Sequence, residues 1–163
     1  MASMARRYGV FNKMSIYHAI VLERLLPDDG TEYEALRGRL HVGVTRAPWT
    51  SELITEWGSN RELRDILHCS MHIPFYMNHT VKLPDGTRGI DGGFTANLAS
   101  IGELPTCTVC VFSAAATIHP AVPYGLLRDC FAPMSKARRD DAVAGGLRDA
   151  LTADLTRLQP PQA

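Results

Sequence analysis

One ordered stretch, residues 59–94, restricts the fold of this chain more than any other part of its sequence. Its first part predicts a helix over Asn60–Met71, because apolar residues recur there at spacings of three and four: Leu63, Ile66 and Leu67. Ser59 is a suitable N-cap for this helix, and Glu62 stands three residues later, as a capping box requires.

The rest of this stretch predicts a turn and then a glycine-rich loop that carries an acid. Pro74 ends the helix, because proline has no N–H to donate and clashes with the preceding turn. The chain then turns back at Pro84-Asp85-Gly86, a composition that suits a tight turn. A short strand within residues 89–93 would deliver the carboxylate of Asp91 into a loop whose glycines let other backbone come close. The order of these parts is more specific than any one of them.

The composition argues against several classes of protein. The 163 residues suit one domain, and 45% of them are hydrophobic, as in an ordinary globular protein. Lys and Arg together number 17, as do Asp and Glu, which argues against a nucleic-acid binder with a broad basic face. No apolar run approaches the ~20 residues that span a bilayer. Four cysteines in a chain of this length favour the reduced state over a disulfide scaffold.

Periodic segments outside this stretch predict alternating helices and strands. Helices are expected at Ser15–Leu26 and around Tyr33–Leu36, and strands at Arg39–Thr45 and Glu52–Trp57. The segment Thr106–Ala114 is nearly all apolar or small, which predicts a buried strand, as in a parallel sheet covered on both faces. Such alternation indicates an α/β layered domain.

The C-terminal part carries the clearest amphipathic helix, predicted over Ser135–Leu158. Its apolar residues recur every three or four positions: Val143, Leu147, Leu151, Leu155 and Leu158. Gly145 and Gly146 weaken its middle, so a split into two helices stays open.

Two residue pairs have a spacing that suits zinc, but their expected geometry argues against a metal site. Cys107 and Cys110 lie three apart, and His68 and His72 lie four apart. Residues three apart in a strand point to opposite faces, so the two cysteines would not converge. The histidines lack the intervening Glu of the metalloprotease pattern. We therefore expect buried, unbridged, metal-free cysteines and histidines that are packed or partly exposed.

No serine of this chain stands in a nucleophile motif. None lies in Gly-x-Ser-x-Gly, the strained turn that exposes a nucleophile, and none begins Ser-x-x-Lys. From the residues alone, Asp91 is the one obvious catalytic candidate, and its alternative role is that of a turn residue that caps the loop.

Several motifs, in this order, resemble the patatin-like phospholipase family. Gly38-Arg-Leu-His-Val-Gly-Val-Thr45 is followed by residues 60–76 with Cys-Ser-Met-His-Ile-Pro-Phe-Tyr, and then by Ile90-Asp-Gly-Gly93. The Pro-Phe-Tyr and the apolar segment after Asp-Gly-Gly are most similar to the adiponutrin and adipose triglyceride lipase branch. The tail also resembles helices of this family, at residues 126–133 and 146–150.

The resemblance implies a three-layer α/β/α sandwich and a Ser–Asp dyad that hydrolyses acyl esters of lipids, with no cofactor and no metal. The Asp-Gly-Gly aspartate corresponds to Asp91, which would be the general base that takes the proton of the serine. Gly92 and Gly93 would let the loop approach the nucleophile. The implied partners are acylglycerols or phospholipids, and the implied location is the cytoplasm, at the surface of a lipid droplet or membrane.

The resemblance covers the C-terminal part of a single domain of this family, with a core match at about residues 38–114 and a helical tail at residues 124–158. The family's first strands, nucleophile elbow and glycine loop have no counterpart in the chain, so an incomplete sandwich is expected. Two interpretations stay open. The chain is part of a lipid acyl hydrolase and carries only the Asp half of the dyad, or it is a non-catalytic lipid-surface or partner-binding module of the same fold.

Overall fold

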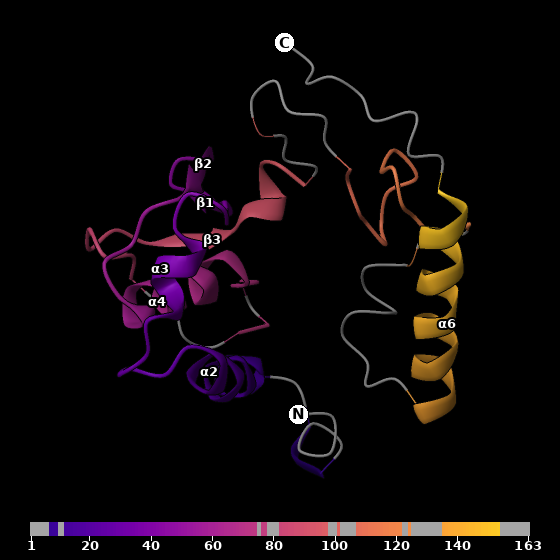
Figure 1. The fold of residues 1–163 in the computed structure, drawn as a ribbon, viewed down its shortest axis with the longest axis horizontal. Helices are drawn as coiled ribbons and strands as arrows, with labels where there is room; N and C mark the ends of the chain where they lie inside the picture. Colours follow the sequence, from indigo (N-terminus) through magenta and orange to yellow (C-terminus); the bar gives the residue numbers. More distant parts are fainter. Residues whose placement is uncertain are drawn as a thin grey trace. The chain divides into compact units, whose positions relative to one another are not determined.

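The structure is a computed structural model that divides into two compact units, Met1–Asn97 and Leu98–Ala163 (Figure 1). The structure describes residues 7–9, 12–74, 76–77, 82–97, 101, 107–121, 124 and 135–153.

The first unit contains a three-stranded antiparallel sheet with the strand order β2-β1-β3. The strands are β1 (Val42–Arg46), β2 (Thr50–Ile54) and β3 (Gly89–Asp91). Residues 47–49 join β1 to β2, a connection that suits antiparallel pairing and is far too short for a parallel crossover. In the central strand, Val44 lies opposite Asp91 of β3. Helices together with this small sheet confirm the predicted α/β class.

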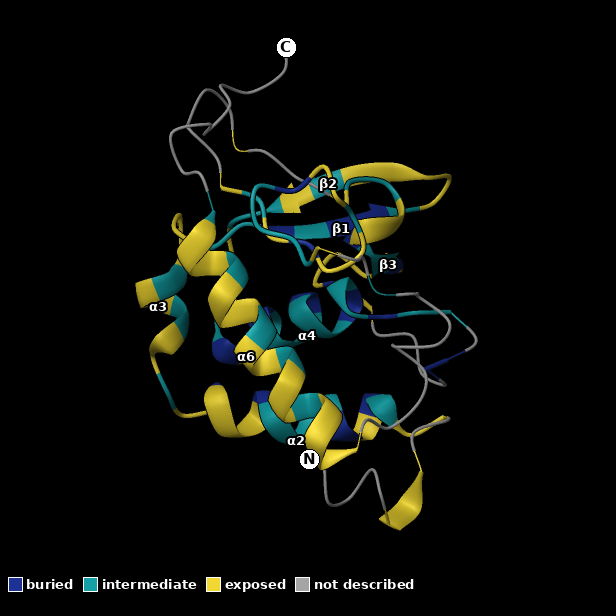
Figure 2. Cartoon of the chain, turned by 90° about the vertical axis from the view of Figure 1, so that its right-hand side faces the viewer, coloured by how far each residue is buried: buried dark blue, intermediate teal, exposed yellow. Residues whose placement is uncertain are grey.

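Helix α4 (Asn60–Ser70) packs against β1 and β3 and closes the core of this unit (Figure 2). The predicted apolar face is confirmed, because Leu63 and Ile66 are fully buried and Leu67 packs partly buried beside them. The core cluster holds eight buried residues: Leu26, Val42, Val44, Trp57, Leu63, Ile66, Cys69 and Leu83. Each large apolar side chain buried here contributes about 1.5–3 kcal/mol to the stability of the fold.

The start of α4 follows the predicted capping pattern with one change. The hydroxyl of Ser59 accepts a hydrogen bond of 3.2 Å from the N–H of Glu62, as expected of an N-cap. The carboxylate of Glu62 accepts in return from the N–H of Gly58, at 2.6 Å, one residue before the N-cap. Two N–H groups at the helix entrance are therefore satisfied by two side chains.

Asn60, the first residue of α4, connects that helix to two helices that precede the sheet. These are α2 (Met14–Leu25) and α3 (Glu32–Leu36), both close to their predicted positions. The buried amide of Asn60 accepts from the N–H of Tyr33 at 2.9 Å and donates to the carbonyl of Pro27 at 2.7 Å. Buried polar groups are stable only when they are hydrogen-bonded, and the connection from α2 through α3 supplies these partners.

In the part of the second unit that the structure describes, the strand predicted at Thr106–Ala114 is absent. Of this segment the structure describes residues 107–114, where a single parallel bridge joins Val109 to Ile118. Hydrogen bonds on both sides of this bridge run from Ile118 N to Thr108 O (2.9 Å) and from Cys110 N to Ile118 O (3.1 Å). The prediction was wrong because it relied on the apolar composition alone, whereas Val109, Val111 and Phe112 remain exposed.

Helix α6 (Lys136–Thr152) confirms the predicted C-terminal helix and runs through Gly145-Gly146 without a break. Ser135 caps it by accepting from the N–H of Arg138 at 3.2 Å. None of its residues is buried, and the three apolar positions that the structure describes are 62–77% exposed: Val143, Leu147 and Leu151. Leu155 and Leu158 lie outside the described residues. Within the described ranges, no helix is long and apolar enough to cross a membrane.

Candidate functional site

Asp91 ends strand β3, and its backbone is held from two sides. Its N–H donates to the carbonyl of His72 at 3.0 Å, and its own carbonyl accepts from the hydroxyl of Thr45 at 2.9 Å. Asp91 is partly buried as a residue, and its carboxylate accepts from the N–H of Gly93 at 2.7 Å in an exposed hydrogen bond that caps the short 3₁₀-helix η1 (Gly92–Phe94). The acid predicted at a strand end is therefore found there, with a defined orientation.

The glycines around Asp91 are required by space. A Cβ atom on Gly92 would lie 2.4 Å from the carbonyl oxygen of Gly43, and one on Gly89 would lie 2.4 Å from a methyl group of Val44 and 3.0 Å from the sulfur of Cys69. The loop can thus press against β1 only because these side chains are missing. Burial raises the pKa of the Cys69 thiol, which keeps the sulfur neutral in this contact.

A serine and a threonine pair complete the surroundings of this loop. The hydroxyl of Ser70 donates to the carbonyl of Gly43 at 2.6 Å, the same carbonyl that faces Gly92. The hydroxyls of Thr45 and Thr95 lie 2.8 Å apart and share a hydrogen bond. These contacts attach the end of α4 and the residues after η1 to the central strand.

Three histidines of the first unit lie on α2, on α4 and just after α4: His18, His68 and His72. Burial lowers the pKa of His18 and of His72, since a charged imidazole is costly away from water. The rings of His18 and His68 meet edge to face with centroids 6.3 Å apart, and the Nδ1 atom of His72 has no hydrogen-bond partner among the described residues. His68 and His72 are therefore a partly buried and a buried histidine.

The geometry of the described residues provides no metal centre. Nowhere in the described ranges do three or more His, Cys, Asp or Glu side chains gather in a way that could hold an ion. Cys107 is exposed and unbridged, which corrects the prediction that it is buried, whereas Cys110 is buried. The correction follows from the missing strand, because only a paired strand would have covered both faces of this segment.

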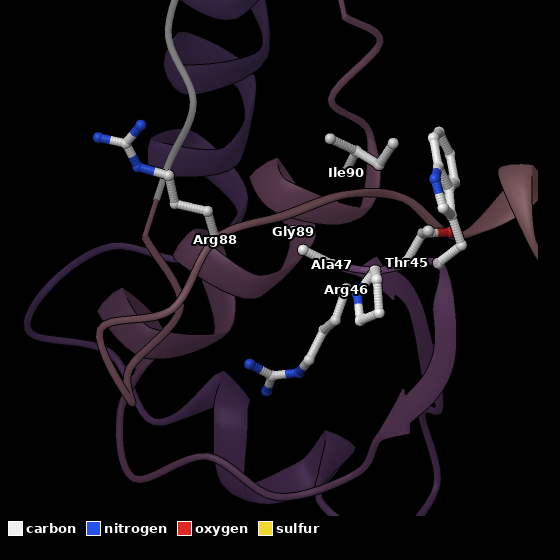
Figure 3. A pocket seen from close by; sticks show the side chains of 8 residues that line it. Thr45, Arg46, Ala47, Arg88, Gly89 and Ile90 are labelled. Atoms are coloured by element: carbon white, nitrogen blue, oxygen red, sulfur yellow. The ribbon is translucent and has the colours of Figure 1, made fainter.

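A pocket of about 300 Å³ lies beside the connection between β1 and β2 (Figure 3). Eight residues line it: Thr45, Arg46, Ala47, Pro48, Trp49, Arg88, Gly89 and Ile90. Asp91 is not among them, although Ile90, its neighbour in β3, is. No sequence pattern indicated this pocket, because it forms between two segments that are distant in sequence.

An exposed aromatic pair adjoins both the pocket and the Asp91 loop. The rings of Trp49 and Phe94 have centroids 6.4 Å apart and are tilted by 55°. Their residues are 69% and 52% exposed, which is unusual for large aromatic side chains in a soluble domain. Phe94 directly follows Asp-Gly-Gly, but no sequence pattern indicated that Trp49 would meet it.

Comparison with known proteins finds relatives for about two thirds of the chain. It is 34% identical over 110 residues to the omega-hydroxyceramide transacylase of Homo sapiens, which covers 67% of this chain and 19% of that protein. It is 33% identical over 111 residues to the patatin-like phospholipase domain-containing protein 2 of Bos taurus, which covers 68% of this chain and 22% of that protein.

A third relative is the 1-acylglycerol-3-phosphate O-acyltransferase PNPLA3 of Homo sapiens, 31% identical over 122 residues, or 72% of this chain and 25% of that protein. The chain thus spans about a fifth to a quarter of the length of these three relatives. No protein-family model matches the chain, and no solved structure does.

Proposed function

The matched segment of this chain belongs to the patatin-like phospholipase family, and from this we propose that the chain is part of a lipid acyl hydrolase in which Asp91 is the general base of a Ser–Asp dyad. The names of its relatives specify a phospholipase domain, a transacylase and an acyltransferase, which supports chemistry at acyl groups of lipids. The proposed substrates are acylglycerols or phospholipids, at a droplet or membrane surface in the cytoplasm.

The observation that carries this proposal is the fixed carboxylate of Asp91. In the proposed step, one carboxylate oxygen takes the hydroxyl proton of a serine while the serine oxygen forms a bond to the ester carbonyl carbon. The ester C–O bond then breaks, and the leaving alcohol takes the proton from Asp91. Water gives a proton to Asp91 as its oxygen attacks the acyl carbon, the free acid leaves, and the serine oxygen regains its proton from Asp91. A base works only when it is held within hydrogen-bonding reach of that proton, and the bonds of Asp91 to Gly93, Thr45 and His72 hold it in one position.

The serine in this proposal is not one of those in the 163 residues, because none of them stands in Gly-x-Ser-x-Gly. The nucleophile and the oxyanion-stabilising N–H groups are expected from polypeptide outside these residues. Reading the coding sequence upstream is the first test: a Gly-x-Ser-x-Gly motif after a glycine-rich loop supports the hydrolase, and its absence from the locus supports the alternative below.

The second test uses the protein extended by that upstream segment. Asp91→Asn keeps the shape of the side chain and removes its basicity, so ester hydrolysis should fall by about 10²–10⁴. The unfolding temperature should change little, and Asp29→Asn, which alters an exposed carboxylate elsewhere in the unit, should leave hydrolysis unchanged. Full hydrolysis by a well-folded Asp91→Asn protein would return Asp91 to the role of a turn residue.

The exposed pair of Trp49 and Phe94 favours the alternative, a non-catalytic module that binds a lipid surface. Trp is enriched at membrane–water interfaces, where its apolar ring and its polar N–H are both accommodated, and the apolar ring of Phe94 lies beside Trp49. Co-sedimentation of the chain with phosphatidylcholine vesicles tests this, with Trp49→Ala/Phe94→Ala as the variant. Vesicle binding that needs both rings, in a protein that lacks a nucleophile, would support the module over the hydrolase.

A further inference from the structure

The pocket beside the β1–β2 connection is lined by two residue pairs of the β1–β3 ladder, Thr45 with Ile90 and Arg46 with Gly89. Consecutive side chains of a strand point to opposite faces, so Ile90 points away from the side that Gly89 and Asp91 share. A Cβ atom on Gly89 would meet Cys69 of α4, which identifies that side as the face covered by the helix. Thr45, the partner of Ile90 across the ladder, lines the pocket with it. Asp91 itself is not among the residues that line this pocket.

The walls of this pocket are mostly apolar. Ala47, Pro48 and Trp49 line it from the β1–β2 connection, and Ile90 lines it from β3. A volume of about 300 Å³ is at the lower end of the range for small-molecule sites. It suits a single acyl chain better than a two-chain lipid.

Two arginines line the same pocket, and only one of them is neutralised. Arg46 forms ion pairs with Glu52 and with Asp85, the latter at 2.8 Å. Arg88 is exposed and has no ion pair within the described ranges. In Figure 3 its guanidinium lies at the outer side of the group of lining side chains. The pocket thus combines an apolar interior with one uncompensated positive charge at its rim.

We propose that this pocket binds a single-chain lipid with an anionic head, a carboxylate or a phosphate monoester. The tail would lie against Trp49 and Ile90, and the guanidinium of Arg88 would bind the head, because its planar fork matches both kinds of oxyanion. The choice of an acyl ligand rests on the proposed function. The test measures ligand binding and not hydrolysis. The lipid-binding proposal can therefore fail while the proposed hydrolase function stands, and the reverse.

Isothermal titration calorimetry of the chain with four ten-carbon ligands below their micelle concentrations tests the proposal. The ligands are decanoate, decyl phosphate, decanol and decyltrimethylammonium. The chain should bind decanoate or decyl phosphate at least about tenfold more tightly than decanol, the gain expected from one charge-assisted contact. The tighter of the two anions identifies the head group. Equal affinity for decanol, preference for the cation, or no binding at all would overturn the proposal.

Two variants locate the site. Arg88→Gln should weaken binding of the preferred anion by about tenfold and leave decanol unaffected. Arg39→Gln is a matched change at an exposed arginine outside the pocket. It should leave the affinities for the preferred anion and for decanol unchanged. Ile90→Ala should weaken both ligands, because it removes part of the apolar wall. Thermal unfolding of each variant verifies the fold, and anion binding that Arg88→Gln does not weaken in a folded protein would contradict the assignment.

Discussion

Gly92 faces the carbonyl of Gly43 so closely that a Cβ atom would lie 2.4 Å from the oxygen. Packing in this chain thus requires the first glycine of Asp-Gly-Gly, in addition to any chemical role of the motif. The glycine after the acid lets the loop pack on the central strand, and this packing holds Asp91 beside Thr45. A change at Gly92 would therefore disturb both the fold and the candidate base.

The first prediction is that Gly92→Ala destabilises the chain by roughly 1–3 kcal/mol, because the added methyl forces two backbone segments apart. Gly146→Ala is the matched control. Nothing lies within 4 Å of the added Cβ there, and alanine favours the helix by about 0.5–1 kcal/mol. Urea unfolding followed by circular dichroism measures both, and equal stability of Gly92→Ala and the unmodified chain would contradict the clash.

Local sequence patterns predicted the helix and the turn that are determined by residues close together in the sequence. The apolar spacing and Ser59 identified α4, and the turn composition identified the bend at residues 84–86, where Gly86 N–H donates to Leu83 O at 2.8 Å and Gly86 has a φ of 80°. Strand β2 begins two residues before its predicted start at Glu52, because its register is set by pairing with β1.

Features that depend on distant segments could not be predicted in this way. Asn60 can be buried because Tyr33 and Pro27 form hydrogen bonds with its amide. From sequence alone, a polar residue at the start of a helix looks like a surface residue. The contact of Gly92 with Gly43 and the pocket beside the β1–β2 connection also join remote parts of the chain. For the candidate site, the sequence located the acid but not the backbone contacts that orient it.

The second prediction concerns the partly buried His18 and the buried His72. Burial lowers the pKa of His18 and His72 in the folded chain below about 6.5, the value of an unperturbed histidine. The unfolded chain then binds more protons in the window below that value. The contribution of these two histidines to the free energy of unfolding is fully present above about pH 6.5. It is lost as the pH falls through their lower pKa values in the folded chain.

The free energy of unfolding should therefore decrease between about pH 7.5 and pH 5.5. His72→Gln removes one of the two titrating groups, so the decrease should be smaller in this variant, even if its stability near neutral pH differs from that of the unmodified chain. Urea denaturation at both pH values measures the two slopes. A slope that His72→Gln leaves unchanged would show that His72 does not contribute.

The last prediction is that the 163-residue chain alone hydrolyses short-chain p-nitrophenyl esters no faster than background. A carboxylate without a positioned nucleophile cannot form the acyl intermediate, and missing oxyanion donors cost a further factor of about 10²–10³. Turnover that survives purification and is lost in Asp91→Asn would contradict this and point to a serine within the chain. Ser70 would be the first to replace, since its hydroxyl is already held against the carbonyl that Gly92 faces. Ser51→Ala, at an exposed position of β2, is the control that should leave such turnover intact.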